Sequence, residues 1–254
     1  MVSLTGKVAV ITGASSGIGL SAVHALLNSN CSVLGVDIAG APDVNHDHFA
    51  FFQVDLAEAE APQRVISASS SAFGNRLDIL INVAGILDAN SSVETLRDED
   101  WDRVIAVNLT APVRLMRSAV KVMKEQRSGS IINVSSKAGE SGAVAGVAYT
   151  ASKHGLLGVT KNTAWLLKEE GIRCNAITPG AVHSNLGRDI DRSKWDIAAF
   201  MKMKPVHDIH ANLMTGEGKI HPDVLADVLL FLASDLSRGV TGAVIPIDNA
   251  WSVI

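Results

Sequence analysis

The sequence predicts a single α/β domain built on a doubly wound parallel sheet of about seven strands, with helices on both faces. Continuously apolar runs are typical of strands buried on both sides of a parallel sheet, and seven occur, at residues 7–12, 31–37, 49–55, 77–85, 129–136, 172–180 and 242–248. Longer stretches with helical spacing lie between them, including 99–127 and 149–170. Strict alternation of strand and helix indicates a doubly wound sheet. With no internal repeat and no break in composition, we expect residues 1–254 to form one domain.

Composition narrows the possible partners and compartment. The chain is 47% apolar and 19% charged, which is typical of a well-packed globular protein. A net charge of −4 offers no attraction to nucleic acid or to an anionic membrane surface, and no apolar run approaches the roughly 18 residues of a membrane span. Two cysteines, Cys31 and Cys174, make no disulfide framework. We therefore expect a soluble, cytoplasmic protein whose partner is a small-molecule substrate.

The turn after the first predicted strand is rich in glycine. It reads TGASSGIG from Thr12 to Gly19, and glycines at 13, 17 and 19 let the backbone approach a ligand where a Cβ would clash. The helical segment 20–30 follows, and unpaired N–H groups at a helix start favour a bound pyrophosphate. The context favours a dinucleotide site over its alternative, a tight strand-to-helix turn.

An acidic residue at the end of the second predicted strand indicates which dinucleotide binds. Asp37 follows Gly19 by 37 − 19 = 18 residues, and a carboxylate there accepts the ribose hydroxyls and repels a 2′-phosphate. The surrounding GVDIAGAP contains no Arg or Lys. The sequence therefore predicts NAD as cofactor. Asp55, at the end of the third strand, is expected to bond the adenine amino group, with an ordinary turn-forming role as the alternative.

Tyr149 is the one tyrosine of the chain, and Lys153 follows it by four residues. On a helix this spacing places both side chains on one face. A neighbouring cation favours the phenolate, so we expect Lys153 to lower the tyrosine pKa from its usual value near 10 and make it an acid/base for an alcohol. A core tyrosine beside a surface lysine is the alternative, and the spacing alone favours neither.

Six motifs, in this order, resemble those of the compact NAD(P)-dependent short-chain dehydrogenases/reductases. They are TGASSGIG, NVAG (82–85), VNL (107–109), INVSS (132–136), YTASK (149–153) and PG (179–180). The resemblance covers nearly the whole chain and implies a Rossmann-like fold. It implies the catalytic residues Asn108, Ser136, Tyr149 and Lys153. Relatives place the serine 13 residues before the tyrosine, and 149 − 13 = 136, so Ser136 is preferred and Ser135 is the fallback.

The resemblance also implies the roles of individual residues. Ser136 would hold the substrate oxygen, Lys153 would bond the nicotinamide ribose, and Asn108 would hold a proton-relaying water, with a core or helix-kink amide as its alternative. The implied cofactor-binding set is Gly13, Ser15, Ser16, Gly17, Ile18, Gly19, Asp37, Asp55, Leu56, Asn82, Ala84, Gly85, Tyr149, Lys153, Pro179, Gly180, Val182 and Ser184. Within it, Asn82 is expected to shape the sheet and the adenosine pocket.

Two departures from the family pattern occur. NVAG replaces Asn-Asn-Ala-Gly, and IDNAWSVI (247–254) stands where relatives often carry Asp-Gly-Gly, which leaves the packing of the C-terminus open. The resemblance implies a homo-oligomer, a tetramer in preference to a dimer, formed through the helices predicted at 99–127 and 149–170.

A long connection, residues 181–221, interrupts the alternation. It carries Trp195, Phe200, Met201, Met203 and Met214, and apolar side chains on a long loop favour a substrate lid, here at about 183–221, over a surface excursion that packs on itself. His183 is a possible pocket-lining residue. The histidine pairs in HDH (46–48) and HDIH (207–210) lack cysteine or dense carboxylate partners, so no metal site is predicted.

These observations together predict an NAD-dependent alcohol dehydrogenase/ketoreductase. It would interconvert a secondary alcohol and a ketone on a mid-sized, hydrophobic or cyclic substrate. A carbonyl reductase that uses NADH or NADPH is one alternative, and a catalytically silent dinucleotide-binding sensor is the other.

Overall fold

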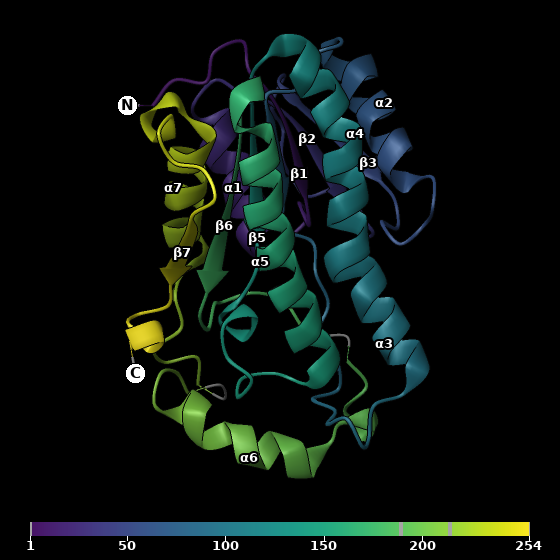
Figure 1. The fold of residues 1–254 in the computed structure, drawn as a ribbon, viewed down its shortest axis with the longest axis vertical. Coiled ribbons are helices and arrows are strands. Elements are labelled where there is room, and N and C mark those ends of the chain that lie inside the picture. Colours follow the sequence, from purple (N-terminus) through teal and green to yellow (C-terminus); the bar gives the residue numbers. More distant parts are fainter. Residues whose placement is uncertain (1, 188–189, 213–214, 254) are drawn as a thin grey trace.

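A computed structural model describes residues 2–187, 190–212 and 215–253, and in these ranges it contains the predicted seven-stranded parallel sheet (Figure 1). The strand order is β3-β2-β1-β4-β5-β6-β7, and every neighbouring pair is parallel. The strands are β1 (Val8–Thr12), β2 (Ser32–Asp37), β3 (Phe49–Gln53), β4 (Ile79–Asn82), β5 (Gly129–Val134), β6 (Ile172–Pro179) and β7 (Val244–Ile247). Most end earlier than predicted, because the chain leaves the sheet there to form loops.

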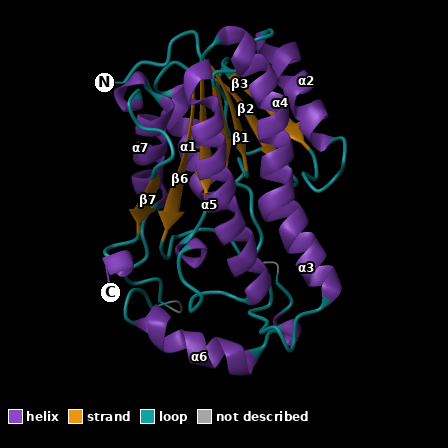
Figure 2. Ribbon diagram, in the orientation of Figure 1, coloured by secondary structure: helices purple, strands orange, loops and turns teal. Residues whose placement is uncertain are grey.

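Helices cover both faces of the sheet, as predicted (Figure 2). One face carries α1 (Gly17–Leu27) and α7 (Pro222–Ala233), which pack against each other. The other face carries α2 (Ala61–Phe73), α4 (Ala111–Gln126) and α5 (Val147–Leu167). In the described ranges no helix is both long and apolar enough to cross a bilayer.

The predicted helix 99–127 contains a distortion. It consists of α3 (Asp98–Ile105), one π-helical turn (Ala106–Thr110) and α4. A π-turn inserts an extra residue into the helix and occurs most often at functional sites. Here it holds Asn108, which is 1% exposed.

The two faces of the sheet have separate apolar cores. Ile11 and Leu229 belong to the core under α1 and α7, and Leu115 and Ile131 belong to the core under α2, α4 and α5. All four side chains are fully buried, and each contributes about 1.5–3 kcal/mol by leaving water. The double core makes the sheet a rigid platform, with its loops held at the carboxyl ends of the strands.

One helix of the long connection, α6 (Ile197–Asp208), lies beyond the carboxyl ends of the strands (Figure 1). Asp196 caps it, because its Oδ1 accepts from the Ala199 N–H at 2.8 Å. The other carboxylate oxygen, Oδ2, accepts from Thr95 Oγ1 at 2.6 Å. Of the apolar residues predicted to cover a site, Met203 is buried and Met201 is 56% exposed. Met214 lies outside the described residues.

Candidate active site

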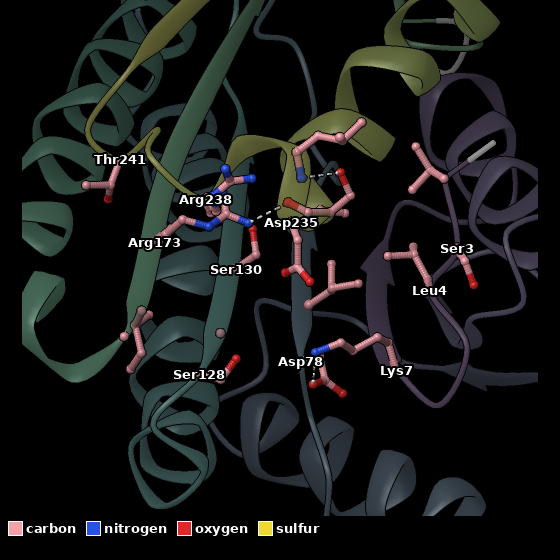
Figure 3. A pocket seen from close by; sticks show the side chains of 18 of the residues that line it. Ser3, Leu4, Lys7, Asp78, Ser128, Ser130, Arg173, Asp235, Arg238 and Thr241 are labelled. Carbon is pink, nitrogen blue, oxygen red and sulfur yellow. Dashed lines mark hydrogen bonds and ion pairs between the residues drawn. The ribbon is translucent and has the colours of Figure 1, made fainter.

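Hollows lie at both ends of the strands. The first, of about 780 Å³, lies at the amino ends of β4, β5 and β6 (Figure 3). Two of the cations that line it are bonded to protein groups: Lys7 Nζ lies 3.3 Å from Asp78 Oδ1, and Arg173 Nη2 donates to the Leu232 carbonyl at 2.8 Å. None of the residues predicted to bind cofactor or substrate lines this hollow.

The second hollow, of about 570 Å³, lies at the carboxyl ends of β1, β2 and β4, and we call it the carboxyl-end hollow. It lies where the strand order reverses beside β1, the position at which open α/β sheets bind ligands. The predicted cofactor residues that line it are Gly13, Ser15, Ser16, Gly17, Ile18, Asp37, Asp55, Leu56, Ala84, Gly85 and Ser184. The candidate active site is therefore at this end of the sheet.

The glycines of the first turn are required by close packing. A Cβ on Gly19 would lie 2.0 Å from the Gly13 carbonyl oxygen, and one on Gly13 would lie 2.9 Å from the Ala84 nitrogen. Gly13 also has φ +69°, a backbone conformation that favours glycine. The turn therefore brings bare backbone to the hollow at the start of α1, which fits a pyrophosphate.

The Asp37 carboxylate is held at the rim of the carboxyl-end hollow by two backbone donors. Oδ2 accepts from the Ser15 N–H and Oδ1 from the Ala39 N–H, each at 3.0 Å. The first of these bonds ties the phosphate-binding turn to the end of β2. The residues present thus fit a dinucleotide whose ribose carries free hydroxyls.

Asp55 has a partner that sequence reasoning missed. Arg103 Nη1 lies 2.9 Å from Asp55 Oδ2, and Arg103 also lines the carboxyl-end hollow. Burial opposes ionisation of Asp55, but the Ala57 N–H and the Arg103 guanidinium outweigh it and hold the carboxyl pKa below its usual value. Arg103 is 48 residues away in sequence, in an acidic segment, and no local pattern points to it.

Tyr149 and Lys153 share one face of α5, as their spacing predicts. Lys153 Nζ lies 5.5 Å from the centre of the Tyr149 ring, and both residues are buried. Ser136 lies near enough to the Tyr149 hydroxyl to lower the pKa of the phenol. Ser135 instead donates its hydroxyl to the Lys153 carbonyl at 3.0 Å, so the structure places Ser136 beside the phenol and turns Ser135 away.

The expected lowering of the tyrosine pKa is wrong for this structure. Burial raises the pKa of Tyr149 to about 12, against a lowering contribution from the Ser136 hydrogen bond. Burial also lowers the pKa of Lys153 to about 8, and its Nζ donates to the Val134 carbonyl at 2.9 Å. Both groups lie out of water, where the charged form of each is penalised.

Asn108 clamps a segment that lines the hollow. Its Oδ1 accepts from the Ile86 N–H at 2.8 Å, and its Nδ2 donates to the Ile86 carbonyl at 2.9 Å and to Ser152 Oγ at 3.2 Å. Both ends of the amide are therefore engaged, as expected of the helix-kink alternative. Its water-holding role stays a prediction.

Several other predicted cofactor residues lie behind or beside the hollow. Asn82 is 2% exposed and donates to Asn133 Oδ1 at 2.8 Å, so its side chain shapes the sheet and does not line the hollow. Lys153 lies close to Gly85, which lines the hollow, because a Cβ placed on Gly85 would be 3.5 Å from Lys153 Nζ. Gly180 donates to the Ile247 carbonyl at the end of β6, beside Pro179, and Val182 pairs with Ile220 across the two ends of the long connection. His183 is exposed and lines a neighbouring hollow of about 630 Å³, to which Gly17 and Ser184 also contribute, and not the carboxyl-end hollow.

The C-terminal segment packs against the long connection and against Tyr149. Trp251 belongs to one buried cluster with Tyr149 and Val144. Its ring stacks on His210 at 4.5 Å and meets His207 edge-on at 5.5 Å between ring centres. The sequence that departs from the family pattern therefore builds part of the surroundings of Tyr149.

The remaining candidate groups show no chemistry of their own. Burial raises the pKa of the Cys31 and Cys174 thiols to about 12, so neither is a nucleophile at neutral pH. In the part of the chain that the structure describes, no three His, Cys, Asp or Glu side chains lie close enough together to hold a metal ion.

Comparison with known proteins finds a matching family, similar sequences and a similar structure. The model of the short chain dehydrogenase family matches residues 7–195. A short chain dehydrogenase of Rhodocybe pseudopiperita is 53% identical over 99% of this chain and all of its own length. Asnovolin H dehydrogenase of Aspergillus novofumigatus is 49% identical over the full length of both chains. The crystal structure of levodione reductase matches with a TM-score of 0.84 and 27% identity, covering 98% of each chain.

Proposed function

Because this chain belongs to the short-chain dehydrogenase family, and is thus an oxidoreductase, we propose that it interconverts a secondary alcohol and a ketone with NAD as cofactor. The observation that carries the proposal is the buried Tyr149 hydroxyl, which lies beside Ser136 and one helical turn from Lys153. A screen of secondary alcohols with NAD⁺ and NADP⁺, followed by NADH or NADPH absorbance, tests it.

The residues of the site divide the work of the reaction. A bound nicotinamide would supply the hydride acceptor for oxidation and the hydride donor for reduction. Ser136 and Tyr149 would hold the substrate oxygen between their hydroxyls. Because the phenol is protonated at neutral pH, Tyr149 would take the alcohol proton as it gives up its own, and in the reverse direction it would give its proton to the ketone oxygen and be reprotonated. Lys153, whose pKa burial lowers to about 8, would exchange that proton onward, because such an ammonium gains and loses protons near neutral pH.

The cofactor preference depends on Asp37. Asp37→Ala removes the acceptor of the ribose hydroxyls and the repulsion of a 2′-phosphate, so we expect NAD⁺ to bind about 10- to 100-fold more weakly and NADP⁺ to bind more tightly. Dissociation constants of both cofactors, measured by quenching of tryptophan fluorescence, check this. Asp43→Ala is the matched control, since Asp43 is an exposed acid in the following loop. A parent enzyme that prefers NADP⁺ would contradict the assignment.

The surroundings of Tyr149 support a mid-sized, hydrophobic or cyclic substrate under a lid at about 183–221. Tyr149 lies in an apolar cluster with Val144 and Trp251, and Leu87 and Val206 pack against it. Val206 is part of α6, so the long connection contributes to this cluster. One relative is named a dehydrogenase of asnovolin H and one similar structure a reductase of levodione, which supports a small organic substrate.

Trp251 should therefore influence substrate choice. Trp251→Ala removes the ring that joins α6 to the Tyr149 cluster, so we expect kcat/KM for bulky cyclic alcohols to fall at least about tenfold more than for small ones. The dissociation constant for NAD⁺ should stay unchanged. Trp251→Phe keeps an aromatic ring and should retain most of the preference. Equal losses for bulky and small alcohols would show that Trp251 serves stability alone.

The proposal also covers the oligomeric state and the cellular compartment. We propose a homo-oligomer, a tetramer in preference to a dimer, formed through the α3–α4 and α5 helices. Trp165 and Leu166 on α5 support it, because they are 68% and 65% exposed and large apolar side chains of this kind favour an interface. The free, buried cysteines Cys31 and Cys174 support a reducing compartment such as the cytoplasm.

A further inference from the structure

A buried carboxylate that the proposed mechanism does not use lies under the start of α5. Asp88 follows β4 in the chain and is 4% exposed. Its Oδ2 accepts from the Tyr149 N–H at 3.0 Å, and its Oδ1 accepts from the Asn90 N–H at 3.1 Å. The nearby N–H groups of Gly146 and Ala148 also favour its charged form. We propose that Asp88 is the positioning residue of Tyr149: its carboxylate accepts the Tyr149 N–H in the first turn of α5 and thereby fixes where the phenol stands. The inference rests on the proposed role of Tyr149.

The start of α5 has no cap of its own. The residue in the capping position is Gly146, which has no side chain to accept a hydrogen bond. The first N–H groups of a helix need acceptors, and a carboxylate there also gains from the helix dipole. Asp88, 61 residues earlier in sequence than Tyr149, fills that position.

Gly146 and Asp88 fit each other. A Cβ on Gly146 would lie 2.3 Å from Asp88 Oδ1 and 2.5 Å from Oδ2, far closer than such atoms approach. Gly146 has φ −67°, which any residue adopts, so backbone conformation does not require glycine here. Glycine is required here because the Asp88 carboxylate occupies the space that a Cβ would need. Gly146 therefore leaves room for the Asp88 carboxylate beneath the start of α5.

The same carboxylate acts on the charge state of the phenol. Asp88 adds to the effect of burial in raising the Tyr149 pKa, since a nearby negative charge disfavours the phenolate. The other charged or titratable groups around Tyr149 are Lys153 on α5 itself and, across Trp251, His207 and His210 of the long connection. Asp88 is the anion among them.

Titration of the phenol tests this directly. Tyr149 is the one tyrosine of the chain, so tyrosinate absorbance reports this group alone and requires no substrate. Asp88→Asn removes the charge and leaves one acceptor oxygen. We expect Tyr149 to ionise at lower pH in this variant, kcat to fall at least about tenfold through misplacement of the phenol, and KM for NAD⁺ to stay within about twofold.

The control is a second buried carboxylate at the other end of the sheet. Asp78 is also 4% exposed and accepts from the Val8 N–H at 3.0 Å. Asp78→Asn should lower stability and leave the Tyr149 titration where it was. An unchanged titration in Asp88→Asn, or an equal shift in Asp78→Asn, would overturn the proposal. If Asp88→Asn does not fold, Asp88→Ser keeps a small acceptor without the charge and is measured in its place.

The fit between Gly146 and Asp88 has its own test. Gly146→Ala should reduce kcat at least about tenfold in the parent, because the methyl group displaces the carboxylate, and should cost little further in an Asp88→Ala background. Equal losses in both backgrounds would contradict the pairing. If the Tyr149 titration shifts in Asp88→Asn but the parent oxidises no alcohol, Asp88 remains the positioning residue of Tyr149 and the proposed reaction is rejected.

Discussion

Replacement of Tyr149 by phenylalanine is expected to lower kcat by about 10²- to 10⁴-fold, the share of catalysis that a positioned acid/base contributes. The change removes one oxygen, which lies beside Ser136, and keeps the ring in its cluster with Val144 and Trp251. Binding of NAD⁺ should therefore persist. Steady-state oxidation of the best alcohol from the screen and fluorescence titration with NADH measure the two quantities.

A neighbouring hydroxyl gives the control for this variant. Thr150 follows Tyr149 in the first turn of α5 and donates its hydroxyl to the Ala145 carbonyl at 3.3 Å. Thr150→Val also removes one hydroxyl and should retain activity within about twofold. A Tyr149→Phe enzyme as active as the Thr150→Val enzyme would remove the phenol from the mechanism. A parent that binds NAD⁺ and turns over no alcohol would favour the silent sensor.

The fold was predictable because its main determinant is visible in the sequence. Strands buried on both faces, such as β5, must be apolar throughout, and alternation with helical segments then indicates a doubly wound sheet. The ends of the strands were not predictable in the same way. Ser135 and Ser136 continue the apolar run that predicts β5, but they leave the sheet to reach Lys153 and Tyr149.

The candidate site was predictable where its determinants are local. The spacing of Tyr149 and Lys153 is a property of one helix, and the structure confirms that they share a face. Burial is not local, so the direction of the tyrosine pKa shift was predicted wrongly. Asp88 and Arg103 were missed for a related reason, since each reaches its partner from a distant segment and no motif contains either of them.

Replacement of Lys153 by methionine is expected to stabilise the protein while it removes activity. Burial lowers the pKa of Lys153 from 10.5 to about 8, so at pH 7 folding takes a charged ammonium out of water. Methionine has a similar length and no charge. We therefore expect the free energy of unfolding at pH 7 to rise by about 1–3 kcal/mol. Loss of the Nζ bond to the Val134 carbonyl reduces this gain. Denaturant melts give the stability, and alcohol oxidation gives the loss of activity.

The pH dependence of the same variant identifies the cause. In the parent, the unfolded chain binds more protons at Lys153 than the folded chain does between about pH 8 and pH 10.5, so this group makes stability rise with pH across that interval. Lys153→Met has no such rise, and its advantage at pH 7 should shrink as pH increases. Lys161→Met, at an exposed position of the same helix, should change stability by no more than about 0.5 kcal/mol at any pH. If Lys153→Met is less stable than the parent at pH 7, the bond to the Val134 carbonyl outweighs the cost of burying the charge. If Lys153→Met is more stable by the same amount at every pH, the gain in stability comes from packing alone.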